Sequence, residues 1–295
     1  MDFVLFYETI HIFLAPTIMH MHFKGQGGLK IVADAWGSDN QDLVILLHGG
    51  GQTRHAWGET GKKLSKAGFY AIAIDLRGHG DSDWHEEGDY SINAYKEDVV
   101  SIIKSLGRPA SLVGASLGGM VSLSLAGDKD YSNLCSSLVM VDIGIYPDPE
   151  GSDRIVNFMQ SGNKGFESLE EAAETISKYL PHREKPKDTK GLIKNLRLKE
   201  NGRYYWHWDP KFISRRQDSR RERFSDQKEY AERVSVPTLL IRGALSDVVT
   251  KEDVKFFLSV IQHAKFEEIE KASHMIAGDR NDMFAESAIK FLKSL

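Results

Sequence analysis

SLVGASLGGMVSL, the stretch from Ser111 to Leu123, decides how this part of the chain folds. It begins as a short apolar run and continues, after its glycines, with apolar residues at helical spacing. Ser116 stands between Gly114 and Gly118, where the strand-like run becomes the helix-like one. A turn this tight holds its central residue in a strained backbone conformation and needs small residues two positions to either side. The stretch therefore predicts a strand, a sharp turn that carries a serine, and a helix.

The pattern of Ser116 between two glycines, G-x-S-x-G, is called a nucleophile elbow, and its meaning depends on the segments around it. A serine hydroxyl is a good nucleophile only when a base takes its proton, an acid orients that base, and hydrogen-bond donors await the developing oxyanion. A glycine-rich junction with a buried serine is the structural alternative. The rest of the sequence decides between them, because it either supplies these partners or lacks them.

The composition is that of an ordinary globular protein. The chain has 295 residues, 41% of them hydrophobic and 27% charged, which suits one large domain with an insertion. A formal net charge of -4 argues against a partner that is a nucleic acid. The single cysteine, Cys135, excludes an internal disulfide and a cysteine-rich metal site, so we expect a reducing compartment, the cytoplasm.

The first residues, 1–20, are apolar but lack the features of a targeting or spanning segment. They carry Glu8 and His11, have no basic start, and show no small-residue cleavage site. We expect an N-terminal extension that is disordered or loosely docked, without stable insertion into a membrane.

Beyond this extension, strand-like and helix-like segments alternate. Short apolar runs predict strands, and helical spacing predicts helices, at 43–48, 69–76, 111–116, 136–142, 237–243 and 265–270 for the strands and at 57–67, 91–106 and 281–292 for the helices. Apolar strands that alternate with helices indicate a mostly parallel sheet covered on both faces. The predicted fold class is therefore α/β, with residues 21–147 and 233–295 as its core.

Between residues 148 and 232 this alternation breaks off, and we predict a helical insertion between two strands of the sheet. The run SRRQDSRRER fits a solvated helix face better than an anion-binding patch. The aromatic cluster RYYWHWDP, from Arg203 to Pro210, forms either the small core of the insertion or the lining of a pocket beneath it. The sequence leaves these two alternatives open.

The stretch LVILLHGGGQTRHAW joins a predicted strand to a turn of three glycines. Glycines let backbone N–H groups approach a substrate oxygen, and one oxyanion donor in such an arrangement comes from this turn while the other belongs to the residue after the nucleophile. We therefore predict Gly50 and Leu117 as the oxyanion donors. Gly51 is the near alternative and a candidate for substrate binding. A plain glycine turn is the structural alternative.

A base and an orienting acid are expected on loops that follow later strands. His274 comes directly after the last predicted strand, in a polar loop before the last helix, which is where the mechanism requires the base. Asp247 follows the strand 237–243 and gives the chain order serine, acid, histidine. Asp142, at the end of another strand, is the main competitor for the acid. Such a triad needs no metal and no organic cofactor.

From about Leu29 to Leu292 the chain resembles the α/β-hydrolase superfamily. The resemblance rests on LLHGGGQTRHAW, IDLRGHGDSD, VGASLGGM, IRGALSD and ASHMIAGDRND, in this order. It implies an α/β-hydrolase fold in which residues 148–232 form a helical cap over the active site. The turn around His79 is structural in this family rather than catalytic. The resemblance also implies that aromatic residues of the cap face the substrate: Tyr205, Trp206 and Trp208.

The resemblance implies acyl transfer to water on a small-molecule substrate, a carboxylic ester or lactone. Ser116 speaks against epoxide hydrolases and haloalkane dehalogenases of this fold, whose nucleophile is an aspartate. It does not separate an esterase from a carbon–carbon bond hydrolase, an acyltransferase or a cofactor-free perhydrolase. A non-catalytic receptor that keeps the fold is the alternative from another class. The sequence leaves the substrate and the oligomeric state open.

Overall fold

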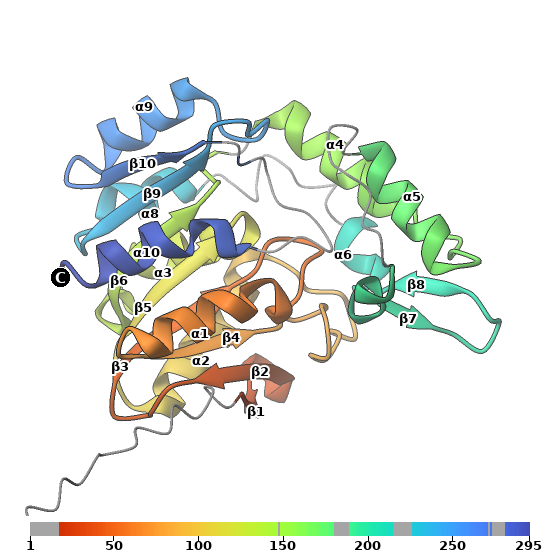
Figure 1. Cartoon of the computed structure of the whole chain (residues 1–295). Coiled ribbons are helices and arrows are strands. Elements are labelled where there is room, and N and C mark those ends of the chain that lie inside the picture. Colours follow the sequence, from red (N-terminus) through yellow and green to blue (C-terminus); the bar gives the residue numbers. More distant parts are fainter. Residues whose placement is uncertain (1–17, 147, 180–188, 215–225, 271, 273–280) are drawn as a thin grey trace, which may run out of the picture.

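The chain folds around one central sheet (Figure 1). The computed structural model describes residues 18–146, 148–179, 189–214, 226–270, 272 and 281–295. Within them the sheet contains β1 (Met19–Lys24), β2 (Lys30–Trp36), β3 (Asp42–Leu47), β4 (Phe69–Ile74), β5 (Ala110–Ala115), β6 (Cys135–Val141), β9 (Thr238–Gly243) and β10 (Lys265–Ile269). The order across the sheet is β1-β2-β4-β3-β5-β6-β9-β10. The pairs β1–β2 and β2–β4 are antiparallel and the other neighbouring pairs are parallel, which confirms the predicted fold class.

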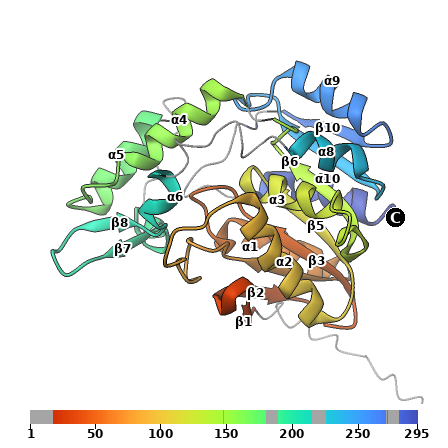
Figure 2. The same cartoon turned by 180° about the vertical axis from the view of Figure 1, so that it is seen from behind.

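Helices cover both faces of the sheet (Figure 1, Figure 2). One face packs against α1 (Gly58–Lys66) and α10 (Ala285–Leu292), and the other against α2 (Ile92–Leu106), α3 (Leu117–Ala126), α8 (Gln227–Arg233) and α9 (Lys251–Val260). Short 3-10 helices lie at Gln26–Gly28, Arg54–Trp57, Ser132–Leu134, Lys190–Asn195 and Asn281–Phe284. In the part of the chain that the structure describes, no helix combines the length and apolarity needed to cross a membrane.

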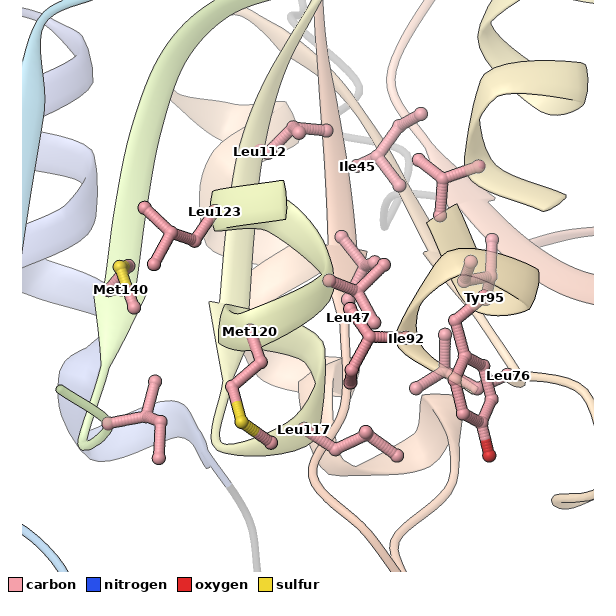
Figure 3. Packing of buried hydrophobic residues seen from close by; sticks show 14 of the residues in the cluster. Ile45, Leu47, Leu76, Ile92, Tyr95, Leu112, Leu117, Met120, Leu123 and Met140 are labelled. Carbon is pink, nitrogen blue, oxygen red and sulfur yellow. The ribbon is translucent and has the colours of Figure 1, made fainter. Parts of the chain in front are cut away.

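The packing between the sheet and α3 fixes the helix that begins directly after Ser116. Figure 3 shows Leu112 of β5 and Met140 of β6 beside Met120 and Leu123 of α3. These side chains are 0 to 2% exposed, and full burial of such a side chain stabilises the fold by about 1.5–3 kcal/mol. The start of α3 is therefore anchored at the carboxyl end of β5.

The antiparallel edge of the sheet is a feature that the sequence pattern does not predict, because the first expected strand begins at residue 43. β1 and β2 form this edge, and β1 begins at Met19. Met19 and His20, placed by the sequence in the extension 1–20, therefore belong to the sheet. The pattern is weak because β1 alternates Met, His and Phe and leaves most of its side chains exposed at an edge.

The insertion between β6 and β9 lies beyond one end of the sheet (Figure 1). Its described elements are α4 (Pro149–Gln160), α5 (Leu169–Tyr179), β7 (Leu196–Leu198), β8 (Tyr204–Trp206) and α6 (Pro210–Ser214). β7 and β8 pair as a small antiparallel hairpin, an element that the sequence prediction of a helical insertion does not include.

The last helix before β9 packs on the core. The Arg233 side chain at the end of α8 donates a hydrogen bond from Nε to the Gly127 carbonyl at 2.8 Å. A Cβ built on Gly127 would lie 2.0 Å from the Tyr230 carbonyl oxygen, so the chain segments approach closely. α8 therefore lies against the segment that follows α3.

Candidate active site

Ser116 occupies a strained turn between β5 and α3. Its backbone angles are φ 46° and ψ -112°, and among the described residues only Asp142 is another non-glycine residue with a positive φ. Such a conformation costs about 1–3 kcal/mol and persists only where the surroundings enforce it. Here the Ser116 N–H donates to the Val141 carbonyl at 3.1 Å, and its own carbonyl accepts from the Met120 N–H at 3.1 Å. Ser116 as a whole is half-buried.

The two flanking glycines are required by close backbone contacts. A Cβ at Gly114 would lie 2.3 Å from the Gly118 carbonyl oxygen, and a Cβ at Gly118 would lie 2.3 Å from the Leu47 carbonyl oxygen. At distances this short, a side chain at either position would force the backbone to shift. The structure thus shows the strand, the sharp turn and the helix that the stretch around Ser116 predicts.

The three-glycine turn lies beside Ser116. The Gly118 N–H donates to the His48 carbonyl at 3.2 Å, and a Cβ built on Gly49 would lie 3.4 Å from the Cβ of Ser116. Gln52 holds both backbone groups of Gly49: its N–H donates to the Gly49 carbonyl at 3.0 Å, and its Oε1 accepts from the Gly49 N–H at 2.9 Å.

Three backbone N–H groups next to Ser116 are left for a ligand. Within the residues described, the N–H groups of Gly50, Gly51 and Leu117 donate to no acceptor. Leu117 is the first residue of α3, where helical N–H groups have no partner in the helix itself. Unused donors on two segments that flank a serine are what an oxyanion hole requires.

Arg54 fixes the chain directly behind the glycine turn. Its Nη1 contacts Asp75 and lies 2.9 Å from a carboxylate oxygen of Asp81, and its Nε lies 3.1 Å from Asp34. Its N–H also donates to Asp75 at 2.7 Å. Burial alone would lower the pKa of Arg54, but the charges of Asp75 and Asp34 outweigh it and raise the pKa. The turn therefore rests on a permanently charged, paired guanidinium.

The two candidate acids have different surroundings, while the predicted base, His274, lies outside the described residues. Asp142 follows β6, is 3% exposed, and accepts hydrogen bonds from the Gly243 N–H at 3.0 Å and from the Ser246 hydroxyl at 2.9 Å. It directly follows Val141, whose carbonyl bonds the Ser116 N–H. Asp142 is thus buried and held by hydrogen bonds. It follows β6, the strand that pairs with β5, and Ser116 follows β5.

Asp247 lies at the surface. Its side chain is 45% exposed and its carboxylate is 2.9 Å from Nη2 of Arg154, a residue of α4 whose side chain is 47% exposed. Arg154 Nε donates to the same carboxylate oxygen at 3.2 Å. The described contacts of Asp247 therefore connect the insertion with the loop after β9.

The three aromatic candidates have separate surroundings. The rings of Trp206 and Trp208 stack with centroids 4.9 Å apart, and Trp206 also packs on Phe158 and Phe166 inside the insertion. The Tyr205 hydroxyl accepts a hydrogen bond from the Asn201 side chain at 2.9 Å, on the hairpin.

Trp208 extends from this aromatic core to the glycine turn. A Cβ built on Gly51 would lie 3.3 Å from Cζ3 of Trp208 and 3.1 Å from Cε of Met159, a residue that the sequence does not single out. Trp206 thus belongs to the core of the insertion, whereas Trp208 lies against the glycine turn. Met159 lies on α4 without any motif around it, so no sequence signal points to it.

His207, between these two tryptophans, is buried and also meets the glycine turn. The Gly80 N–H donates to its Nδ1 at 2.7 Å, and its Nε2 lies 3.1 Å from the Gly51 carbonyl oxygen. Burial lowers its pKa to about 3. The sequence offers no signal for these contacts of His207 with Gly80 and Gly51, because a histidine inside an insertion has no motif of its own.

Other reactive groups are placed structurally. Cys135 is buried at the start of β6, and burial raises the pKa of its thiol to about 12, so the thiol stays protonated and unreactive. Among the described residues no three or more histidine, cysteine, aspartate or glutamate side chains form a group that could hold a metal ion.

The sequence of this chain is similar to those of known hydrolases. The profile of the alpha/beta hydrolase family matches residues 44–287. Esterase Rv0045c of Mycobacterium tuberculosis is 30% identical over 257 residues, which cover 85% of this chain and 82% of the esterase. The 2-(acetamidomethylene)succinate hydrolase of Mesorhizobium japonicum is 36% identical over 116 residues, 39% of each protein.

Solved structures share the fold. The structure of E-2-(acetamidomethylene)succinate hydrolase superposes with a TM-score of 0.79 at 22% identity and covers 94% of this chain and 100% of the other. A structure of the Mycobacterium tuberculosis esterase has a TM-score of 0.71 at 26% identity and covers 95% of this chain and 92% of the other. The resemblance therefore extends over the core and the insertion together.

Proposed function

Since the chain belongs to the alpha/beta hydrolase family, we propose that it is a serine hydrolase that cleaves a carboxylic ester or lactone of a small molecule. The observation that carries this proposal is the turn at Ser116, strained at φ 46° and flanked by two segments with unused N–H donors. The esterase of Mycobacterium tuberculosis, similar over most of both chains, supports the choice of an ester bond.

In the proposed mechanism the Ser116 hydroxyl attacks the carbonyl carbon while His274 takes its proton. The N–H of Leu117 and that of Gly50 or Gly51 bind the oxyanion of the tetrahedral intermediate. His274 then protonates the leaving alcohol, and the acyl group stays on Ser116. Water, deprotonated by His274, attacks this acyl-enzyme and releases the acid.

For the acid that orients His274, the order of motifs favours Asp247, whereas the surroundings in the structure support Asp142. An orienting acid acts through a fixed, buried carboxylate that stabilises the imidazolium. Asp142 has these properties, and it directly follows the residue that bonds the Ser116 backbone. Asp247 is exposed and its charge is already paired with Arg154. We therefore propose Asp142 as the acid and keep Asp247 as the alternative.

The insertion is proposed to act as the cap over this site. Trp208 and Met159 stand against Gly51 and are apolar, which supports an apolar group next to the reacting carbonyl. Trp206 contributes indirectly by stacking on Trp208. Tyr205 is held on the hairpin and no described contact brings it to Gly51. A cytoplasmic setting, suggested by the single cysteine, belongs to the proposal as well.

A fluorophosphonate probe tests the proposal without a guess about the substrate. We expect covalent labelling of Ser116, mapped by mass spectrometry after digestion, and its loss in Ser116→Ala and His274→Ala. Labelled wild-type protein should also lose hydrolysis of short 4-nitrophenyl esters. A folded wild-type protein that neither reacts with the probe nor hydrolyses esters would refute the proposal and favour the receptor alternative.

A further inference from the structure

We propose that His207 is a positioning residue for the oxyanion turn, acting as a neutral imidazole that donates from Nε2 to the Gly51 carbonyl. The inference rests on the proposed function, because it takes the turn beside Ser116 as the oxyanion-binding segment. His207 belongs to the insertion, so its contact joins the proposed cap directly to the catalytic machinery. It would act through the turn and not through contact with substrate.

The hydrogen bonds of His207 select one tautomer. Its Nδ1 lies 2.7 Å from the Gly80 backbone nitrogen, which is a donor, so Nδ1 must accept and carries no proton. The single proton of a neutral ring is then on Nε2. This atom lies 3.1 Å from the Gly51 carbonyl oxygen, which only accepts. Both ring nitrogens are therefore satisfied in the neutral form with the proton on Nε2.

Charge on this ring is disfavoured by its surroundings. His207 is 1% exposed, and burial lowers its pKa to about 3; His48 and Arg197 lower it further, while the Gly51 carbonyl and Asp81 act in the opposite direction. The ring of His79 lies 5.9 Å away. A second proton on Nδ1 would also face the Gly80 N–H. The ring is thus neutral, and its Nε2 donates to the Gly51 carbonyl, at pH values well above 3.

The carbonyl that His207 binds controls the orientation of the turn. The Gly51 carbonyl and the Gln52 N–H belong to one peptide group, and this N–H donates to the Gly49 carbonyl at 3.0 Å. The peptide is therefore held from both ends, by the turn and by His207. Gly51 has φ +79° and no side chain, so the turn has other accessible conformations. Fixing this peptide keeps the unused N–H groups of Gly50 and Gly51 in one orientation.

The attachment of the insertion to the core does not depend on His207 alone. An experiment can therefore separate a role of His207 in this attachment from a role in positioning the glycine turn. The Tyr90 hydroxyl donates to the Asp209 carboxylate at 2.6 Å, and the Asp209 N–H donates to the Gly78 carbonyl at 2.9 Å. These bonds fasten the same segment two residues further along. Tyr90→Phe removes the first of them without touching the glycine turn.

The test compares His207→Asn, His207→Gln and the control Tyr90→Phe. An Asn amide reaches the position of Nδ1 and can accept from Gly80, but cannot reach Gly51; a Gln amide reaches the position of Nε2 and can donate there. Removal of an oxyanion donor lowers kcat by about 10²–10³-fold, so for a misoriented donor we expect His207→Asn to lower kcat about 10- to 100-fold with KM within about threefold. The rate of Ser116 labelling by the fluorophosphonate should fall in parallel. His207→Gln should recover much of kcat.

Tyr90→Phe should lower Tm and leave kcat unchanged, since it removes the bond to Asp209 and the one that the hydroxyl accepts from the His85 N–H at 3.2 Å, and neither involves the glycine turn. If His207→Asn lowers Tm in the same way but keeps the wild-type kcat, the inference is overturned. Absence of labelling and turnover in the wild type would instead overturn the proposed function. Should the His207 variants fail to fold, ¹⁵N NMR of the wild-type histidines decides. We expect one buried ring, that of His207, to be neutral and protonated on Nε2 at pH 5, whereas the buried His48 ring accepts on Nε2 from the Leu76 N–H and carries its proton on Nδ1; if no buried ring is neutral with its proton on Nε2 at that pH, the inference fails.

Discussion

Ser116 and Asp142 adopt backbone conformations that side chains other than glycine rarely take, with φ 46° and φ 51°. They follow the neighbouring strands β5 and β6, and the Ser116 N–H bonds the residue before Asp142. Each such conformation costs energy, so two of them at adjacent strand ends show that the surrounding structure enforces this arrangement. At the scale of the residue, the strained pair therefore lies at the centre of the candidate site.

The two candidate acids can be ranked by conservative substitution. Asp142→Asn should lower kcat about 10³–10⁴-fold, because the amide would favour the wrong tautomer of His274. Asp247→Asn should change kcat less than about tenfold, since it breaks an exposed ion pair worth about 1 kcal/mol or less. Steady-state hydrolysis of one ester by both purified variants gives the ranking. The opposite ranking would assign the acid to Asp247.

The close packing at Gly114 predicts a loss of stability that has nothing to do with catalysis. Gly114→Ala should destabilise the fold by about 1–3 kcal/mol or more, because its Cβ would overlap backbone atoms of Gly118. Gly58→Ala is the matched control: no atom lies within 4 Å of its Cβ, and it is in α1, so the change should be neutral or mildly stabilising. Urea denaturation measures both, and equal stability of the two variants would contradict this account.

At the scale of elements, the segment after β8 joins the insertion to the core. The consecutive residues His207, Trp208 and Asp209 all contact the core. His207 bonds the glycine turn and Gly80, Trp208 lies against the same turn, and Asp209 bonds Gly78 and Tyr90. β8 ends directly before this segment, so its pairing with β7 fixes where the segment begins. The hairpin therefore sets the position of residues that the sequence shows only as an aromatic cluster within the insertion.

Trp208 should determine which esters are accepted. Trp208→Phe makes room beside Gly51, so we expect kcat/KM for bulkier acyl groups to rise relative to acetyl esters. Trp206→Phe, a substitution of the same size in the core of the insertion, should mainly lower Tm. A series of 4-nitrophenyl esters of increasing chain length measures the preference. An unchanged chain-length profile in Trp208→Phe would show that this ring does not line the substrate site.

At the scale of the whole molecule, buried histidines link stability to pH. Burial lowers the pKa of His48, His55 and His207, for His207 to about 3. In the unfolded chain the pKa of a histidine is about 6.5. At any pH between the lower folded pKa and this unfolded pKa, the unfolded state therefore binds more protons than the folded state. The stability from each neutral ring is complete above about pH 6.5 and is lost as the pH falls, by up to about 1.4 kcal/mol per pH unit for each histidine.

We therefore expect the free energy of unfolding to decrease from pH 7.5 to pH 5.5, and the decrease to be smaller in His207→Gln. The control is His22→Gln, a substitution of an exposed residue on the edge strand β1. This variant should keep the wild-type slope, because the carboxylates contribute equally to the slopes of the wild type and the variant. Urea denaturation at several pH values measures the slopes. An identical slope in His207→Gln would show that this ring is not held neutral in the folded protein.

The fold could be predicted because its signals are local. Most parallel strands are runs of apolar residues, and the sequence predicts all of them, including β10, where apolar and charged residues mix. β1 escapes because its exposed edge carries a mixed pattern, and in β2 the charged residues Lys30 and Asp34 interrupt the apolar pattern. The turn at Ser116 is local as well. The clash that requires Gly114 arises with Gly118 and Gly119, within five positions, so the glycine pattern is visible in the sequence, although the Ser116 N–H is also held by the distant Val141 carbonyl.

The sequence by itself thus determined the serine at its turn, the glycine turn and the class of fold around them. The tertiary structure decided the surroundings that give these parts their chemistry. Asp142 and Gly243 are 101 positions apart, Arg154 and Asp247 are 93 apart, and His207 and Gly51 are 156 apart. Whether a carboxylate is buried or a histidine reaches a turn depends on how distant segments pack together, and no local pattern of residues encodes that contact.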